Sequence, residues 1–414
     1  MRRFTITSAA ILALFSVGWA SGPETSPRPV LRAASFAAAS SDVSLAEWLS
    51  SFRERAIAQG IAPAVLDSAL RGVAYDADII RRDRNQAEFT KTVWEYLDTA
   101  VSDLRIANGR KAAKSWSESL AQIEARYGVE KEIVVAIWGL ESAYGSFRGS
   151  IDTVSALVTL AYDGRRAAFF EKELIALLRI LQSGDVGRAA LRGSWAGAMG
   201  HTQFMPSSYQ AHAVDFDQDG RRNIWGTDPR DALASTAAYL RHFGWQQGQP
   251  WGVEVRLPKG FDFTLADRAV TKLATDWQAL GVAPVGAISD SFGPASLLLP
   301  GGAQGAAFMI FANFEVLEAY NTADAYVIGV GHLADRIAGG PQIRQAWPRQ
   351  LRALTKAERI ELQERLTAAG FDTVKIDAKM GPLTINAVRA FQLSRGILPD
   401  GYPSLPLLER LRGL

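Results

Sequence analysis

The chain contains no cysteine among its 414 residues, which excludes disulfide bonds and thiolate chemistry. The same absence predicts that no lipid is attached to an N-terminal cysteine. Neither sign of charge is in large excess, because the chain has 45 lysines and arginines and 43 aspartates and glutamates, which gives a net charge of +2. Because the two signs are nearly balanced, the composition gives no indication of a basic surface for nucleic acid.

Long apolar runs are scarce, and the one notable run lies near the start. Residues 9–17 follow two arginines and lead into Gly18-Trp19-Ala20. This order is typical of a cleaved secretory signal, and the run is too short for a permanent membrane span. We therefore predict a signal peptide over residues 1–20 and a Ser-, Pro- and Ala-rich flexible tether over residues 21–42, in an exported protein without a membrane anchor.

What the sequence does contain is enough apolar material for a large core, since 48% of its residues are hydrophobic. Apolar side chains recur at helical spacing over most of residues 43–243. The composition changes from 244 to about 302, where proline and glycine increase and short runs such as 253–257 predict strands. We expect a mainly α chain with a small β-rich subdomain inserted at about 244–302.

The end of the chain has the pattern of a separate unit. Residues 341–350 are predicted to be a linker, and residues 351–414 contain signals for three helices, beginning with a capping box between Thr355 and Glu358. A unit of this size has a modest core. It is more typical of a binding module than of an enzyme.

One stretch carries a carboxyl group of special interest. Apolar residues recur at helical spacing over residues 133–144, and Gly145 is expected to be the left-handed residue at the helix end. Glu141 then lies in the last turn, where apolar neighbours and the negative end of the helix dipole both favour its protonated form. A general acid needs such a proton near neutral pH. The alternative is a solvated glutamate at a helix end.

Two further features point to ligand binding. The loop over residues 193–200 is rich in glycine, and Ser194 lacks the spacing of a nucleophile elbow, so the glycines favour close approach of backbone to a ligand. Arg165 and Arg166 precede a helical pattern that reaches Leu181. Two cations in a first helical turn oppose the dipole, and they are either a solvated pair or a ligand-binding pair.

Carboxylates alternate over residues 215–219 and a glycine follows, as in the first half of a calcium loop. Alternate side chains converge on a hard cation in such a loop, and the carbonyl of Arg221 can contribute. The second half departs from the pattern, because position twelve is a glycine. Asp228 or Asp231 would have to close the site, and a plain aspartate-rich turn without metal remains the alternative.

Taken together and in order, these motifs resemble the lytic murein transglycosylase B family over residues 43–340. The resemblance is carried by Gly139-Leu140-Glu141-Ser142, Ser194 to Gly200, Gln203 to Ser208, the aspartate loop and Ala319-Tyr320-Asn321. Residues 351–414 resemble the common peptidoglycan-binding domain through Asp377, Gly381, Thr384, Ala387, Phe391-Gln392 and Asp400-Gly401. The resemblance implies a lysozyme-like α+β catalytic body followed by a three-helix peptidoglycan-binding domain.

The resemblance also implies an activity in cell-wall remodelling or turnover. The MurNAc–GlcNAc β-1,4 bond would be cleaved without water, leaving a 1,6-anhydro-MurNAc end. Glu141 would act first as acid and then as base, while the acetamido group of the substrate stabilises the anomeric cation. No cofactor is required for this chemistry. The expected partners are glycan strands and stem peptides, and the expected location is the periplasm.

The resemblance further assigns binding roles. Sugars would be held in a groove by Ser194, Gln203, Tyr320, Asn321 and Tyr326, and the acidic stem peptide would meet Arg165 and Arg166. A structural Ca²⁺ or Na⁺ would be held by Asp215, Asp217, Asp219, Arg221 and Asp231. A non-catalytic wall-binding or scaffold protein, and a hydrolase, remain the competing hypotheses.

Overall fold

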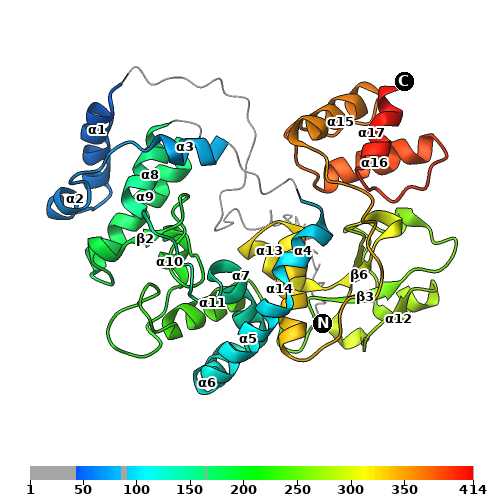
Figure 1. The fold of residues 1–414 in the computed structure, drawn as a ribbon, viewed down its shortest axis with the longest axis horizontal. Coiled ribbons are helices and arrows are strands. Elements are labelled where there is room, and N and C mark those ends of the chain that lie inside the picture. Colours follow the sequence, from blue (N-terminus) through cyan, green and yellow to red (C-terminus); the bar gives the residue numbers. More distant parts are fainter. Residues whose placement is uncertain (1–42, 85–90, 164–165, 414) are drawn as a thin grey trace, which may run out of the picture.

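The structure is a computed structural model that describes residues 43–84, 91–163 and 166–413 (Figure 1). The predicted signal peptide and tether fall on residues 1–42, and these lie outside the described residues, as does Arg165. Within the described ranges, no helix is both long enough and apolar enough to cross a membrane.

The first and larger part of the described chain is a helical body around one extensive apolar core. Its β structure is a short antiparallel pair, β1 (Ile151–Asp152) with β2 (Arg192–Gly193). Its helices are α1 (Leu45–Ala58), α2 (Pro63–Ala69), α3 (Ala77–Arg84), α4 (Val93–Ala100), α5 (Asp103–Ser115), α6 (Ser117–Tyr127), α7 (Lys131–Ser142), α8 (Thr153–Tyr162), α9 (Ala167–Ser183), α10 (Pro206–His212) and α11 (Arg230–His242).

Local sequence explains where these helices begin. Ser44 and Glu47 form a capping box in front of α1, and Asp152 caps α8 by accepting from the Ser155 N–H at 2.7 Å. The expectation of two cations in a first helical turn is wrong for Arg166. Helix α9 begins after it, so the guanidinium does not oppose the dipole from within the helix.

The predicted β-rich subdomain is present but extends beyond residue 302. Its antiparallel sheet has the order β4-β3-β6-β5, with a core of its own around Trp277. The strands are β3 (Gly252–Arg256), β4 (Ala283–Pro284), β5 (Ser296–Leu298) and β6 (Ala307–Ile310), and α12 (Ala274–Ala279) packs nearby. Strand β6 is fully buried and pairs with both β3 and β5. The subdomain therefore includes residues up to 310.

The chain then returns to the helical body through α13 (Ala312–Tyr320) and α14 (Asp324–Ile337). Helix α14 packs against both α7 and α4, as Figure 1 shows near the middle of the molecule. This return brings residues after 320 beside the helix that carries Glu141.

The C-terminal module comprises α15 (Lys356–Ala368), α16 (Pro382–Ser394) and α17 (Leu405–Arg412), around a third apolar core. The predicted capping box between Thr355 and Glu358 is confirmed at the start of α15. In Figure 1 the module lies next to the β-rich subdomain. Asp400 Oδ2 accepts from the backbone N–H of Ala303 at 3.0 Å, which fastens the module to that subdomain.

The segment over 341–350 is laid along the molecule. The carboxylate of Glu254 in β3 accepts the backbone N–H groups of Arg344 at 2.9 Å and Gln345 at 2.7 Å. The Gln345 side-chain amide donates to the Val255 carbonyl at 2.7 Å. These contacts hold the middle of the segment against the sheet.

Aromatic packing holds the end of the same segment. The ring of Trp347 lies 6.0 Å from that of Trp94 in α4 and 6.4 Å from that of Phe308 in β6. Arg349 forms an exposed ion pair with Asp98 at 2.8 Å. The segment before the module is therefore attached to both the helical body and the β-rich subdomain.

Candidate active site

Glu141 lies one residue before the end of α7, and only 9% of its surface is exposed. Nearly every residue of α7 from Ile133 to Gly139 is buried, which places the helix through the centre of the helical body. The alternative of a solvated glutamate at a helix end is excluded by this burial. The sequence prediction of an enclosed carboxyl group in the last helical turn is confirmed.

A polar partner of Glu141 comes from a distant part of the sequence. The hydroxyl of Tyr326, in the first turn of α14, donates to Glu141 Oε1 at 2.6 Å. Tyr326 is 2% exposed, so its ring presents no open face for a sugar. The side chain faces the carboxyl group, and the predicted contact with a sugar stays a prediction.

Tyr320, at the end of α13, lies near the carboxyl group of Glu141. Its hydroxyl donates to the Thr202 carbonyl at 2.5 Å, and the residue is 1% exposed. Burial, and then the nearby charge of Glu141, raise the pKa of Tyr320 well above its ordinary value. Tyr320 therefore stays neutral and supports the loop at Thr202.

The turn that follows α7 is unusual. Three consecutive residues have positive φ: Ala143 at 48°, Tyr144 at 58° and Gly145 at 83°. Gly145 is left-handed as predicted, but the helix ends earlier because Ala143 has already left the helical region. Non-glycine residues adopt this conformation rarely and at a cost, and here the Tyr144 hydroxyl anchors the turn by donating to the Arg105 carbonyl at 2.7 Å.

His201 forms a second layer of polar contacts around the end of α7. Its Nδ1 accepts from Trp138 Nε1 at 3.1 Å, so Nε2 carries the proton and donates to the Gly226 carbonyl at 2.8 Å. Burial lowers the pKa of His201 to about 4. The Ser142 hydroxyl donates to the His201 carbonyl at 2.5 Å, which ties the loop to the residue after Glu141.

Three predicted sugar contacts lie on loops, where Ser194 and Asn321 are half-buried and Gln203 is buried. Ser194 Oγ accepts from the Ala198 N–H at 3.0 Å, and Asn321 Oδ1 accepts from the Ala323 N–H at 3.2 Å. Gln203 has a positive φ of 54°, and its amide nitrogen donates to the Gly200 carbonyl at 2.9 Å. These side chains shape the loops on which they stand.

The Arg166 side chain contacts other residues of the protein. Its Nη2 lies 2.9 Å from Asp83 Oδ1, and the two side chains are only 12% and 3% exposed. The guanidinium also lies 4.7 Å from the ring centre of Phe170. The structure thus places Arg166 in a buried ion pair, in contrast to the predicted contact with an acidic stem peptide.

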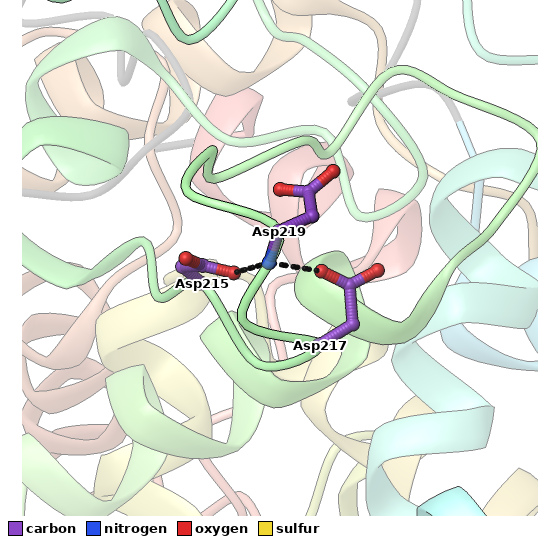
Figure 2. Close-up of side chains that lie close together, drawn as sticks. All are labelled: Asp215, Asp217 and Asp219. Atoms are coloured by element: carbon purple, nitrogen blue, oxygen red, sulfur yellow. Dashed lines mark hydrogen bonds between the residues drawn. The ribbon is translucent and has the colours of Figure 1, made fainter.

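The aspartate loop brings three of its predicted ligands together. Carboxylate oxygens of Asp215, Asp217 and Asp219 all lie within 4.8 Å of one another (Figure 2). The backbone N–H of Asp219 points between its two neighbours, 3.2 Å from Asp215 Oδ1 and 3.3 Å from Asp217 Oδ1. The Arg221 N–H donates to Asp219 Oδ1 at 2.8 Å.

Asp231 is not one of these three clustered carboxylates, and its predicted role as a metal ligand stays a prediction. The residue is 4% exposed, with Oδ1 accepting the Phe216 N–H at 2.8 Å and Oδ2 accepting the Asn223 N–H at 2.7 Å. It therefore holds the two ends of the loop together. Arg230 Nη2 lies 3.2 Å from Asp217 Oδ2 and offsets part of the loop's negative charge.

The structure thus assembles one enclosed carboxyl group with a hydroxyl donor. Such a set can donate and accept a proton at one place. Sequence reasoning missed Thr202, Ser142 and His201 as supports, because a backbone carbonyl acceptor leaves no signature in a sequence.

Comparison with known families gives two matches. The family described as "Transglycosylase SLT domain" matches residues 44–335, and the family described as "Putative peptidoglycan binding domain" matches residues 355–411. The first match covers more than half of the chain. The second covers nearly all of the C-terminal module.

Known proteins of similar sequence or structure have related descriptions. Membrane-bound lytic murein transglycosylase B of Escherichia coli K12 is 33% identical over 249 residues, 59% of this chain and 66% of that protein. SltB3 from Pseudomonas aeruginosa, in complex with NAG-anhNAM-pentapeptide, superposes with a TM-score of 0.86 at 46% identity, covering 89% of this chain and 99% of that one. The E. coli lytic transglycosylase SLT35 in complex with calcium gives a TM-score of 0.61 at 29% identity, covering 70% and 92%.

Proposed function

Since the chain belongs to the transglycosylase SLT family, we propose that it is a peptidoglycan lytic transglycosylase with Glu141 as its single acid and base. The bond cleaved is the β-1,4 bond between MurNAc and GlcNAc, and the product carries a 1,6-anhydro-MurNAc end. The observation that supports this role is the enclosed Glu141 carboxyl group with the Tyr326 hydroxyl 2.6 Å from Oε1.

The reaction follows from one carboxyl group acting twice. Protonated Glu141 gives its proton to the glycosidic oxygen as the C1–O bond breaks, and the acetamido group of MurNAc stabilises the positive charge at C1. Ionised Glu141 then takes the proton of the MurNAc 6-hydroxyl as that oxygen bonds to C1.

We also propose roles for the loops near Glu141. Ser194, Gln203 and Asn321 contact the sugars: Ser194 and Asn321 are half-buried side chains on loops, and Gln203, at 8% exposed, is as enclosed as Glu141 at 9%. Tyr320 and Tyr326 act from behind, through Thr202 and Glu141. This division separates side chains that touch glycan from those that hold the acid in place.

The remaining parts of the chain fit action on the cell wall. We propose that residues 1–20 are a signal peptide, that 21–42 are a tether, and that residues 43–340 and 351–414 are the catalytic and peptidoglycan-binding domains. The protein would then act in the periplasm. N-terminal sequencing of the protein recovered from a periplasmic fraction should begin after residue 20.

We propose further that the aspartate loop holds a structural cation, Ca²⁺ or Na⁺, with no part in the chemistry. The fit is provided by three converging carboxylates, a donor set that hard cations prefer. Asp215, Asp217 and Asp219 would be the side-chain ligands. Asp231 would keep the loop closed by its backbone contacts.

The decisive experiment compares the products of wild type and the Glu141→Gln variant on purified sacculi by mass spectrometry. Wild type should release fragments with anhydro ends. The variant should lose about 10²- to 10⁴-fold in rate while still binding sacculi, because only the transferable proton is removed. Reducing-end products would make the protein a hydrolase, and an inactive wild type that binds sacculi would favour the scaffold hypothesis.

A further inference from the structure

Arg268 occupies a place between the β-rich subdomain and the two helices that flank the active site. It stands on the loop before α12, and its side chain crosses to the corner where α13 ends and α14 begins. Nη1 lies 2.6 Å from Glu318 Oε1, and Nη2 lies 2.6 Å from Asp324 Oδ1. The guanidinium also lies 4.9 Å from the ring centre of Phe314 on α13.

These contacts span the break that carries the site. Glu318 is two residues before Tyr320, and Asp324 is the first residue of α14, two residues before Tyr326. A planar guanidinium with two separate N–H arms can bridge two carboxylates at a fixed spacing, which an ammonium group cannot reproduce. The bridge therefore fixes the angle at which α14 leaves α13.

The position of the Tyr326 hydroxyl depends on that angle. Tyr326 meets Glu141 from the first turn of α14, close to the end that Arg268 clamps. The clamp is also partly shielded from water, with the Arg268 side chain 28% exposed and those of Glu318 and Asp324 20% and 34% exposed. Shielding strengthens such a bridge relative to a surface ion pair.

We propose that Arg268 is a positioning residue for this reaction, holding the Tyr326 hydroxyl on Glu141 by clamping the α13–α14 corner. The proposal rests on the proposed role of Glu141. Arg268 touches neither the carboxyl group of Glu141 nor the hydroxyl of Tyr326 through any contact found in the described residues, so it acts through the helices.

The C-terminal module reaches the same loop from its other side. Arg389 on α16 donates to the Ala266 carbonyl at 2.6 Å and lies 3.5 Å from Asp267 Oδ2. Its side chain is 8% exposed. Residues 266–268 are thus held between the module and the active-site corner, and the module supports the clamp.

The test is a double-mutant cycle with Arg268→Gln, Tyr326→Phe and the combined variant, measured as initial rates of anhydro-ended product release. Each single change should lower kcat by about 10-fold with little change in KM, because an interaction that orients the acid is lost rather than a contact with sugar. The combined variant should be no slower than Tyr326→Phe alone, since both changes remove the same hydrogen bond. The pH–rate profiles of both single variants should shift in the same direction.

Two controls keep the result interpretable. Arg268→Lys keeps the charge but not the two-armed bridge, and it replaces Arg268→Gln in the cycle if that variant folds poorly. Its kcat should fall by a similar factor. Arg349→Gln removes an exposed ion pair with side chains 57% and 54% exposed, and it should match wild type. Wild-type rate in Arg268→Gln, or a combined loss equal to the product of the single losses, would overturn the proposal, whereas an inactive wild type would overturn the proposed function itself.

Discussion

At the scale of single residues, the side chains around Glu141 differ in what their removal should cost. A buried carbonyl that loses its donor remains unsatisfied, whereas a buried hydroxyl without a partner costs nothing to remove. The structure contains both cases. Tyr320 donates to Thr202 at 2.5 Å, while the buried Tyr127 hydroxyl has no hydrogen-bond partner among the described residues.

We predict that Tyr320→Phe lowers the free energy of unfolding by about 1–3 kcal/mol, because the Thr202 carbonyl is left buried and unpaired. Tyr127→Phe should be neutral or stabilising. Denaturant unfolding of both variants beside wild type measures the difference. Equal effects from the two changes would show that the Tyr320 contact contributes nothing.

A second prediction concerns acid. Burial lowers the pKa of His201 to about 4 from an ordinary 6.5, so between these values the unfolded chain binds a proton that the folded chain does not. Stability should therefore be full above pH 6.5 and fall as the pH drops toward 4. Melting temperatures of His201→Gln should decline less steeply over this range than those of wild type. Parallel slopes would contradict the prediction, although His212 and His332, whose pKa values are lowered in the same direction, contribute equally to both proteins.

The residue scale also shows what sequence could reveal about the site. The position of Glu141 followed from apolar spacing and from the resemblance of its motif, and both held. The contacts of Tyr320 with Thr202 and of Tyr326 with Glu141 were not predicted, because a motif gives residue identity but not the direction of a side chain. Arg268 gave no signal at all, since its partners lie 50 and 56 residues away in the chain.

At the scale of elements, helix starts were the most predictable feature. Capping residues such as Thr355 and Asp152 act within one turn, so sequence contains the whole interaction. Strand β6 was less predictable, because its four buried residues carry no alternation and its place was decided by pairing with β3 and β5. Helix α7 ends earlier than predicted, also because of a contact distant in sequence: Tyr144 is held by its hydrogen bond to α5.

The aspartate loop supports a prediction at this scale. Calcium should raise the melting temperature of wild type, because it neutralises three close carboxylates, and chelation should lower it. Asp219→Asn should remove most of this response, while Asp67→Asn, an exposed aspartate on α2, should keep it. A melting temperature that ignores both calcium and chelator would argue against a bound metal, and a response to sodium alone would identify the monovalent ion.

At the scale of the whole molecule, the core of the helical body continues into the β-rich subdomain through Phe308 and Ile310 of β6, whereas the C-terminal module has a separate core and is held by polar contacts. Sequence predicted the existence of the three parts from changes in composition and helical pattern. It could not predict how they meet. The contacts of Arg389 and Asp400 link positions more than 90 residues apart, and nothing local marks them.

We predict that Arg389→Met uncouples the C-terminal module, because the Ala266 carbonyl and Asp267 lose their partner across the interface. Calorimetry of wild type should show one transition, and the variant should show an additional, earlier one. Its kcat should fall in the direction expected for Arg268→Gln, but less. A single unchanged transition with wild-type rate would mean that the module and the body do not depend on each other.

The attachment of residues 341–350 has a consequence for how wall fragments are delivered. A binding module on a loose chain raises the effective concentration of its ligand according to the length of that chain. Here Glu254 and Trp347 hold the segment against β3 and α4, so the contour length of the segment does not set the distance between the module and the body in this structure. The direction from which a glycan strand bound by the module approaches the helical body is then set by these contacts. Lengthening the segment would change that direction rather than increase the distance at which the module can bind.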